Sequence, residues 1–166
     1  MLNTLKMYIE NGVDECIENS PVSRGSADVT EAKNNCAIDS ENLAQLREKV
    51  LKFDLCEIKK TAVNTVFGDG NPKAKIMFIG EAPGANEDKE GIPFCGQSGK
   101  LLNNIIKALG FLREDVYITN TVFWRPPGNR RPTPTEIAQC KPFVEKHIAL
   151  VNPELIVSVG STAVES

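Results

Sequence analysis

The stretch Lys75-Ile-Met-Phe-Ile-Gly-Glu-Ala-Pro-Gly-Ala-Asn-Glu-Asp88 decides the fold. Its apolar beginning predicts a short buried β-strand over 75–80. A Pro-Gly turn and three acidic residues, Glu81, Glu87 and Asp88, follow that strand. Open α/β sheets bind their ligands just outside the carboxyl ends of the strands. This loop is therefore the first candidate for a functional site.

Helices and strands alternate around this stretch. Apolar spacing predicts helices over 40–51 and 97–109, and further buried strands over 116–119, ending at Asn120, and 154–159, ending at Gly160. Strands that alternate with helices indicate a parallel sheet covered on both faces. We therefore expect a three-layer α/β/α domain with a short, mostly parallel central sheet.

Local signals define the expected helices more closely. The first carries Leu43, Leu46 and Val50 on one face. The helix over 97–109 is expected to bury one apolar stripe and to end at Gly110 as its C′ residue; the stripe is Leu101, Leu102, Ile105, Ile106 and Leu109. A later helix should begin at Thr133-Pro-Thr-Glu136, with Thr as N-cap and Pro at N1, and should kink or break near Pro142.

Bulk properties limit the class of protein. The chain has 166 residues, enough for one domain, and a net charge of −3, so any nucleic-acid binding needs a local basic patch. Its 5 cysteines are odd in number and show no paired spacing, which favours reduced thiols over a disulfide framework. With no membrane-length apolar run and no signal-peptide pattern at the N-terminus, we expect a cytoplasmic protein.

The two ends of the chain differ from its middle. Residues 2–19 have the apolar spacing of a short helix, and residues 20–40 are rich in Ser, Asn and Asp, as in a flexible linker. The expected domains are therefore an extension with a linker over 1–40 and an α/β domain over 41–166. Residues 160–166 resemble only the first turn of a helix, so we expect a truncated chain with an incomplete sheet.

Three residues near the strand ends are candidates for chemistry. Glu81 can orient or activate a water molecule; the alternative is a solvated loop acid. Phe94, in the loop before 97–109, can stack on a flat ligand such as a base, or it can fill the core. The Asn120 amide offers donors and acceptors suited to a pyrimidine edge, or it can serve as a turn residue.

Basic and phosphate-binding signals are weaker. Arg125, Arg130 and Arg131 share one Pro/Gly-rich loop and can contact phosphates, or they can be a solvated charged loop. Residues 96–100 lack the full spacing of a nucleotide-triphosphate loop, although their backbone N–H groups can hold one phosphate. His147, the single histidine, is expected on a helix surface, and no residue set has zinc-ligand spacing.

Taken together in order, these motifs resemble the family 4 uracil-DNA glycosylases. The resemblance runs from about residue 54 to the end, and residues 5–23 also resemble the N-terminal extension of the alphaproteobacterial branch. The segments that carry it are Gly80-Glu-Ala-Pro-Gly84 with Glu87-Asp88, Pro93-Phe94 with Gly96, Ile118-Thr-Asn120, Arg125-Pro-Pro-Gly-Asn129, Pro132-Thr-Pro134 and Val66-Phe-Gly-Asp-Gly-Asn-Pro72.

The resemblance implies hydrolysis of the N-glycosidic bond of deoxyuridine in single- or double-stranded DNA, by a monomer, in base excision repair. It assigns Glu81 as the catalytic acidic residue, whose carboxylate positions or activates the water molecule. Substrate-binding positions are Gly80, Glu87, which crowds the place of a thymine methyl, Phe94, which stacks on the flipped uracil, and Asn120, which reads its edge. DNA contacts fall to Ser98, Arg125, Arg130 and Arg131.

Two departures from the family matter. Members commonly hold a 4Fe–4S cluster through four cysteines, but only Cys56 and Cys140 match, with Phe53 and Trp124 at the other two positions. We therefore expect no cluster and apolar packing in its place. The family's His-Pro-Ser segment, whose histidine donates to the uracil oxygen, would lie beyond residue 166, which predicts impaired activity.

Two other functions remain open at this point. One is a catalytically inactive DNA-binding remnant of the same fold, which would keep the arginine loop and Phe94. The other is an unrelated small-molecule α/β enzyme that uses Glu81 and Asn120. Binding of uracil-containing DNA and release of uracil separate the three.

Overall fold

The computed structural model describes residue 38 and residues 40–165, all within a unit that spans Asn35–Ser166. The predictions for 2–19, for the branch-specific extension and for nearly all of the linker lie outside the described residues.

The strands are β1 (Asp69–Gly70), β2 (Ile76–Gly80), β3 (Tyr117–Asn120) and β4 (Leu155–Val159). The α-helices are α2 (Leu43–Lys52), α3 (Ala85–Glu90), α4 (Gln97–Ala108), α5 (Pro134–Val151) and α6 (Ser161–Glu165). Short 3₁₀ helices are η1 (Glu57–Thr61), η2 (Arg113–Asp115) and η3 (Pro127–Asn129).

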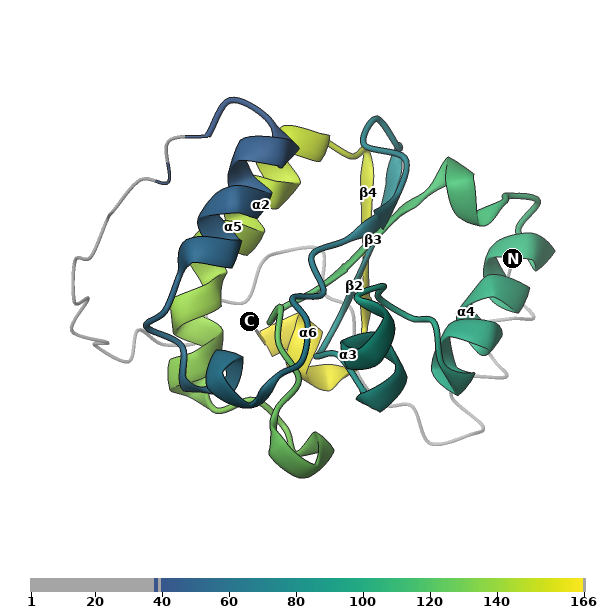
Figure 1. The fold of residues 1–166 in the computed structure, drawn as a ribbon. Helices are drawn as coiled ribbons and strands as arrows, with labels where there is room; N and C mark the ends of the chain where they lie inside the picture. The colour runs from purple at the N-terminus through teal and green to yellow at the C-terminus, as the bar shows by residue number, and fades with distance from the viewer. Residues whose placement is uncertain (1–37, 39, 166) are drawn as a thin grey trace, which may run out of the picture. The chain divides into compact units, whose positions relative to one another are not determined.

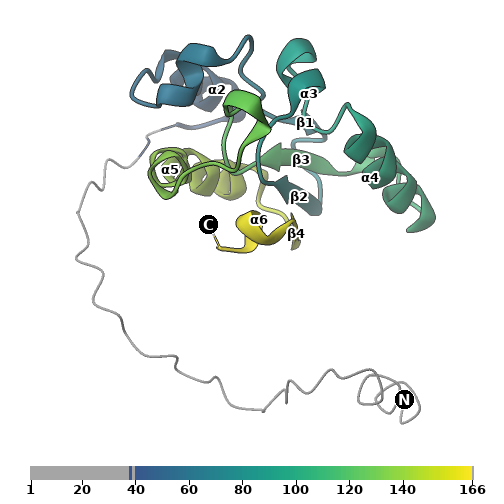
Figure 2. The same cartoon turned by 90° about the horizontal axis from the view of Figure 1, so that it is seen from below.

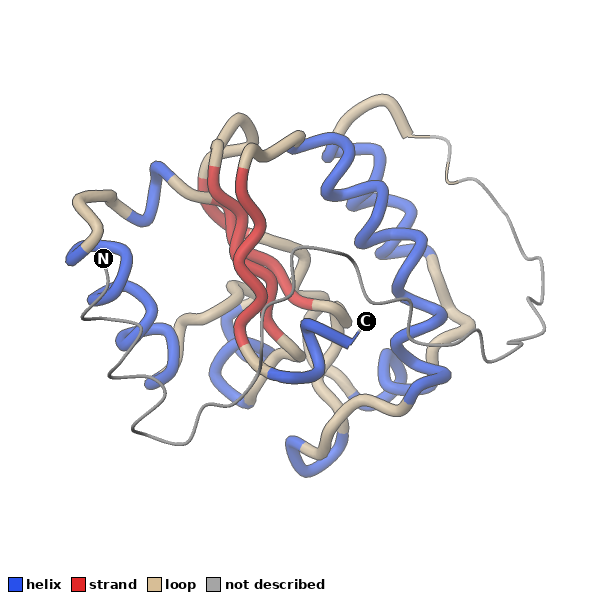
Figure 3. The backbone as a smooth tube through the Cα atoms, turned by 180° about the vertical axis from the view of Figure 1, so that it is seen from behind, coloured by secondary structure: helices blue, strands red, loops and turns tan. Residues whose placement is uncertain are grey.

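The four strands form one sheet (Figures 1 and 3), and their order in it is β1-β3-β2-β4. Strand β2 pairs in parallel with both β3 and β4, and only β1 is antiparallel. The expected strands and the mostly parallel sheet are thus confirmed. Strand β1, only two residues long, has no periodic signal in the sequence and was not predicted.

Alternate residues of the strands face opposite helix layers. Met77, Ile79 and Tyr117 pack against α5 through Val151 and Ile148. On the other face, the apolar cluster contains Phe78, Ile118, Leu102 and Ile106, the last two from α4. Helices α2 and α5 lie on one side of the sheet and α3 and α4 on the other (Figures 1 and 2). The expected three-layer arrangement is confirmed.

The helix ends follow the sequence signals. Gly110 has φ 86°, and the N–H groups of Gly110 and Phe111 donate to the carbonyls of Lys107 and Ile106, which closes α4 with a Schellman motif. Thr133 and Glu136 form the predicted capping box at the start of α5. Of the kink or break predicted near Pro142, the break is wrong, since α5 continues from Pro134 to Val151. Buried residues on both sides of Pro142 anchor the two halves of the helix against the core, which offsets the lost hydrogen bond.

Two predicted burial patterns are also wrong. Leu101 and Ile105 of α4 and its C-cap residue Leu109 are exposed, because the helix docks only through the narrower stripe of Leu102 and Ile106. Strand β4 was expected to be buried, but most of its residues are exposed because its only partner among the described residues is β2. No helix in the described part of the chain combines the length and apolar character needed to cross a membrane.

His147 was expected on a helix surface and lies instead in the core, fully buried. It belongs to the face of α5 that covers the sheet, where its ring stacks on Phe67 at a centroid distance of 4.3 Å. Its Nε2 lies 2.6 Å from the Tyr117 hydroxyl oxygen. Burial lowers the pKa of the imidazole to about 3, so it is neutral at physiological pH.

Candidate active site at the carboxyl ends of β2 and β3

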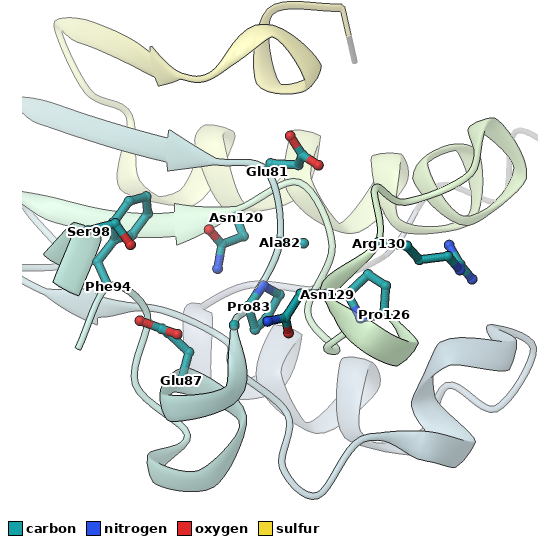
Figure 4. Close-up of a pocket in the computed structure, with 11 residues that line it drawn as sticks. Glu81, Ala82, Pro83, Glu87, Phe94, Ser98, Asn120, Pro126, Asn129 and Arg130 are labelled. Carbon is teal, nitrogen blue, oxygen red and sulfur yellow. The ribbon is translucent and has the colours of Figure 1, made fainter. Parts of the chain in front are cut away.

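A pocket opens where β2 and β3 end, at the position expected for ligands of an open α/β sheet (Figure 4). It is bounded by the loop after β2, the segment before α4 and the loop after β3. Six of the residues predicted for the site line it: Glu81, Glu87, Phe94, Ser98, Asn120 and Arg130. The structure adds Ala82, Pro83, Gly84, Pro126 and Asn129.

Gly80 lies beneath the pocket and controls how closely its walls approach. The parallel register places Gly80 beside Asn120, with both residues on the same face of the sheet. A Cβ atom at Gly80 would lie 2.5 Å from both the Asn120 Oδ1 and the Phe94 Cζ. Only glycine at this position lets the amide and the aromatic ring come together.

Asn120 carries the clearest functional signal. The residue is 2% exposed, and its Nδ2 atom has no hydrogen-bond partner. Buried polar groups are nearly always paired, because an unpaired donor costs about 1–3 kcal/mol. Figure 4 shows this amide directed toward the side of the pocket that holds Phe94 and Glu87. The Asn120 amide is thus a buried donor at the pocket wall, ready for a ligand acceptor.

The loop after β2 is fixed by hydrogen bonds to neighbouring segments. The Thr121 N–H donates to the Gly80 carbonyl at 2.8 Å, and the Thr121 hydroxyl donates to the Glu81 carbonyl at 2.6 Å. These bonds hold the backbone of Glu81 while its half-buried carboxylate faces away from Glu87, Phe94 and Asn120 (Figure 4). Glu81 therefore lines the pocket with its carboxylate directed away from the Phe94 ring (Figure 4).

Glu87 and Asp88 are both buried but differ in role. The Gly96 N–H donates to the Glu87 Oε1 at 2.8 Å, so this pocket carboxylate also fixes the segment before α4. Asp88 is not part of the pocket lining. Its carboxylate accepts the N–H groups of Val63 and Asn64, which makes it an anchor for a neighbouring loop.

The three arginines of the loop after β3 have different surroundings. Arg130 forms a two-pronged ion pair with Glu136, at 2.9 and 2.6 Å, and this bond lowers the pKa of the Glu136 carboxyl. Arg125 donates to Asn129 Oδ1 at 2.6 Å. Arg131 is exposed and lies outside the pocket lining, with a 3.4 Å contact to Ser161 Oγ. Only Arg130 of the three borders the pocket, and Asn129 beside it was missed because a Pro-Gly-Asn turn indicates only a loop.

Comparison with known proteins agrees with this geometry. Residues 67–166 match the model of the uracil DNA glycosylase superfamily. The chain belongs to the uracil DNA glycosylase superfamily. The match begins just before β1 and includes every strand and every residue that lines the pocket.

Several relatives carry the name type-4 uracil-DNA glycosylase. The relative from Sulfurisphaera tokodaii is 47% identical over 121 residues, which cover 72% of this chain and 55% of the relative. The relative from Archaeoglobus fulgidus is 42% identical over 75% of this chain and 63% of its own length. The relative from Thermotoga maritima is 47% identical over 70% of this chain and 60% of its own length. The chain thus spans little more than half the length of these uracil DNA glycosylases.

The positions that the resemblance assigns to an iron–sulfur cluster lie together in the core. Cys56 and Cys140 are fully buried and their thiols hydrogen-bond; this bond lowers the pKa of Cys56 and raises that of Cys140. Phe53 stacks on Trp124 at a centroid distance of 6.3 Å and meets Phe143 edge-on at 4.9 Å. Among the described residues, no three His, Cys, Asp or Glu side chains are grouped to hold a metal ion. Two thiols packed beside aromatic rings do not fit the four-thiolate set of a 4Fe–4S cluster.

Proposed function

We propose that this chain is a uracil-DNA glycosylase polypeptide that hydrolyses the N-glycosidic bond of deoxyuridine in single- or double-stranded DNA. The unpartnered Asn120 amide beside the Phe94 ring carries the proposal. A base that leaves the helical stack needs a stacking face and a hydrogen-bonding edge reader in its pocket. Membership of the superfamily supports the same function.

The proposal gives each pocket residue a role. Phe94 stacks on the extruded uracil, and Asn120 donates Nδ2–H to a uracil oxygen. Glu87, held by the Gly96 N–H, occupies the space that a thymine methyl would need. Glu81 orients a water molecule. The water oxygen bonds to C1′ as the C1′–N1 bond breaks, and uracil leaves as an anion with the electron pair of that bond. One proton of the water stays on the new C1′ hydroxyl, and the other is released and neutralises the uracil anion.

Stabilisation of the departing uracil anion is the demanding part of this reaction. The single histidine of the chain cannot supply it from the described structure, because His147 is buried against Tyr117 and Phe67, away from the pocket lining. Asn120 is the buried amide donor of the described pocket, whereas Asn129, the other amide that lines it, is exposed. Removal of this donor should therefore affect chemistry as well as binding.

The test is release of uracil from a uracil-containing oligonucleotide, with Asn120→Ala as the variant. Loss of one fixed donor should lower the rate about 100-fold or more. Asn104→Ala, which removes an exposed amide from α4, is the matched control and should leave the rate unchanged. If the full chain binds the oligonucleotide in a salt-dependent manner and releases no uracil, the inactive DNA-binding alternative is correct. Binding of free nucleotides without DNA binding would favour a small-molecule enzyme.

We also propose that the chain carries no iron–sulfur cluster, and that Phe53 and Trp124 replace two ligands with apolar packing. Support comes from the stacked aromatic pair beside the two thiols. Protein purified without oxygen should contain far less than one cluster of iron and acid-labile sulfide per chain. A variant with both Phe53→Cys and Trp124→Cys regains the four thiols and should bind more iron. A stoichiometric cluster in the unmodified chain would refute this proposal.

A further inference from the structure

The stacking ring of the pocket depends on an unfavourable backbone conformation. Phe94 has φ 51°, in the left-handed region that non-glycine residues rarely adopt. Such a conformation is energetically unfavourable and persists only where surrounding contacts impose it. Helix α4 imposes the Phe94 conformation from one side. A Cβ at Gly99 would lie 1.8 Å from the Phe94 carbonyl oxygen, so the helix packs directly against the Phe94 peptide.

The other constraint is Arg113, which lies outside the pocket lining, in η2 before β3. Its Nη2 donates to the Pro93 carbonyl at 2.6 Å, and its Nη1 donates to the Phe94 carbonyl at 3.3 Å. The same Nη1 donates to Asn103 Oδ1, on α4, at 3.0 Å. The Arg113 guanidinium thus links α4 to the peptides of Pro93 and Phe94, and these two peptides set the direction of the Phe94 ring.

Arg113 is itself held from the opposite side by β1. Its Nε donates to Asp69 Oδ2 at 2.7 Å in an ion pair that is partly shielded from solvent. Gly70 allows this approach, because a Cβ there would lie 2.0 Å from the Val116 carbonyl oxygen and 3.3 Å from that of Arg113. The two-residue strand therefore supplies the carboxylate that orients the guanidinium.

We propose that Arg113 is a positioning residue that acts through Phe94: with Asp69 it holds the Pro93–Phe94 peptides so that the ring faces Asn120. The consequence for catalysis rests on the proposed glycosylase function. A planar fork with several donors is required, since a lysine ammonium at the same place can reach only part of this set.

The first arm of the test measures loop order and needs no activity. Amide hydrogen exchange is followed in the full chain at Gly96, whose N–H bonds to Glu87 Oε1, and at strand amides as reference. Arg113→Met and the milder Asp69→Asn should speed exchange at Gly96 by roughly tenfold or more and leave β2 and β3 unchanged. Lys107→Met, which removes an exposed cation from α4, is the control and should change neither. Equal acceleration throughout the sheet, or no change at Gly96, overturns the proposal.

The second arm measures uracil release in a double-mutant cycle. Arg113→Met should lower kcat/KM about 10- to 100-fold, as expected for a ring displaced by up to 1 Å, and Arg113→Lys should restore only part of it. In a Phe94→Ala background the same substitution should have almost no effect, because the ring through which it acts is gone. A loss of equal size in both backgrounds overturns the proposal. If the unmodified chain releases no uracil, the glycosylase function fails while the exchange arm still decides the role of Arg113.

Discussion

Gly80→Ala tests the close approach on which the pocket is built. The added Cβ would lie 2.5 Å from Asn120 Oδ1 and from Phe94 Cζ, which is roughly 1 Å inside ordinary carbon contact distance. Neither neighbour can yield freely, since Asn120 is buried at a strand end and the Phe94 carbonyl is packed against α4. The ring or the amide must therefore move by about 1 Å.

A displacement of this size predicts two separate costs. Overpacking should lower the free energy of unfolding by about 1–3 kcal/mol. Misplacement of the reacting groups should lower the rate of uracil release about 100-fold, equivalent to about 2.7 kcal/mol in the transition state. Single-turnover release from an oligonucleotide, measured well below the unfolding midpoint, separates the second cost from the first.

Gly68→Ala provides the matched control. A Cβ there would lie 2.6 Å from the Tyr117 hydroxyl oxygen, an overlap of similar size in the core and outside the pocket lining. Urea unfolding should show both variants destabilised, with only Gly80→Ala slow in chemistry. If Gly80→Ala keeps a rate within threefold of the parent, or if Gly68→Ala loses as much activity, then the Gly80 contact does not set the catalytic geometry.

Other parts of the structure lead to three further predictions. Burial holds the pKa of folded His147 at about 3, against about 6.5 in the unfolded chain, so the stability that the neutral imidazole contributes is complete above pH 6.5. This contribution falls as the pH decreases toward 3, by up to about 4–5 kcal/mol. Urea unfolding at pH 4, 5 and 6 should show this additional pH dependence of stability in the parent and not in His147→Leu. Arg131→Ala should reduce the slope of log DNA affinity against log salt concentration by about 1, because one phosphate contact is lost. Arg130→Ala breaks the ion pair with Glu136 and should instead lower the thermal unfolding midpoint. The reverse pattern would contradict the assignment of Arg131 to DNA binding and of Arg130 to stability. Gly99→Ala should destabilise by about 3 kcal/mol in urea unfolding, because its Cβ meets backbone that cannot rotate away, and a midpoint equal to that of the parent would show that α4 shifts at little cost.

The sheet and the pocket were predictable where local patterns coincide with position in the fold. The apolar run of β2, followed by a turn with acidic residues, indicated a strand end with a binding loop, and Asn120 ended the next strand. Because parallel strands share one carboxyl edge, these two signals had to converge. The contribution of Gly80 follows from register, which composition does not reveal.

The failures have a common physical origin in long-range packing. His147 has an intermediate tendency to be buried, and only the aromatic partners Phe67 and Tyr117, distant in sequence, place it in the core. The apolar pattern of α4 exceeds what the helix buries, so Leu101 and Ile105 remain exposed. Arg113 gave no signal at all, because it acts through carbonyl groups that the sequence does not distinguish.

The register of β2 has a consequence for engineering. Gly80 of β2 is the register partner of Asn120 in β3 on one side and of Val159 in β4 on the other. A one-residue slip of β2 would turn Gly80 to the opposite face and bring a larger side chain against the Phe94 ring. Transplanting the motif at 80–88 into another scaffold therefore requires the neighbouring strand with its amide in the same alignment, and the smallest portable unit is a pair of strands, not a loop.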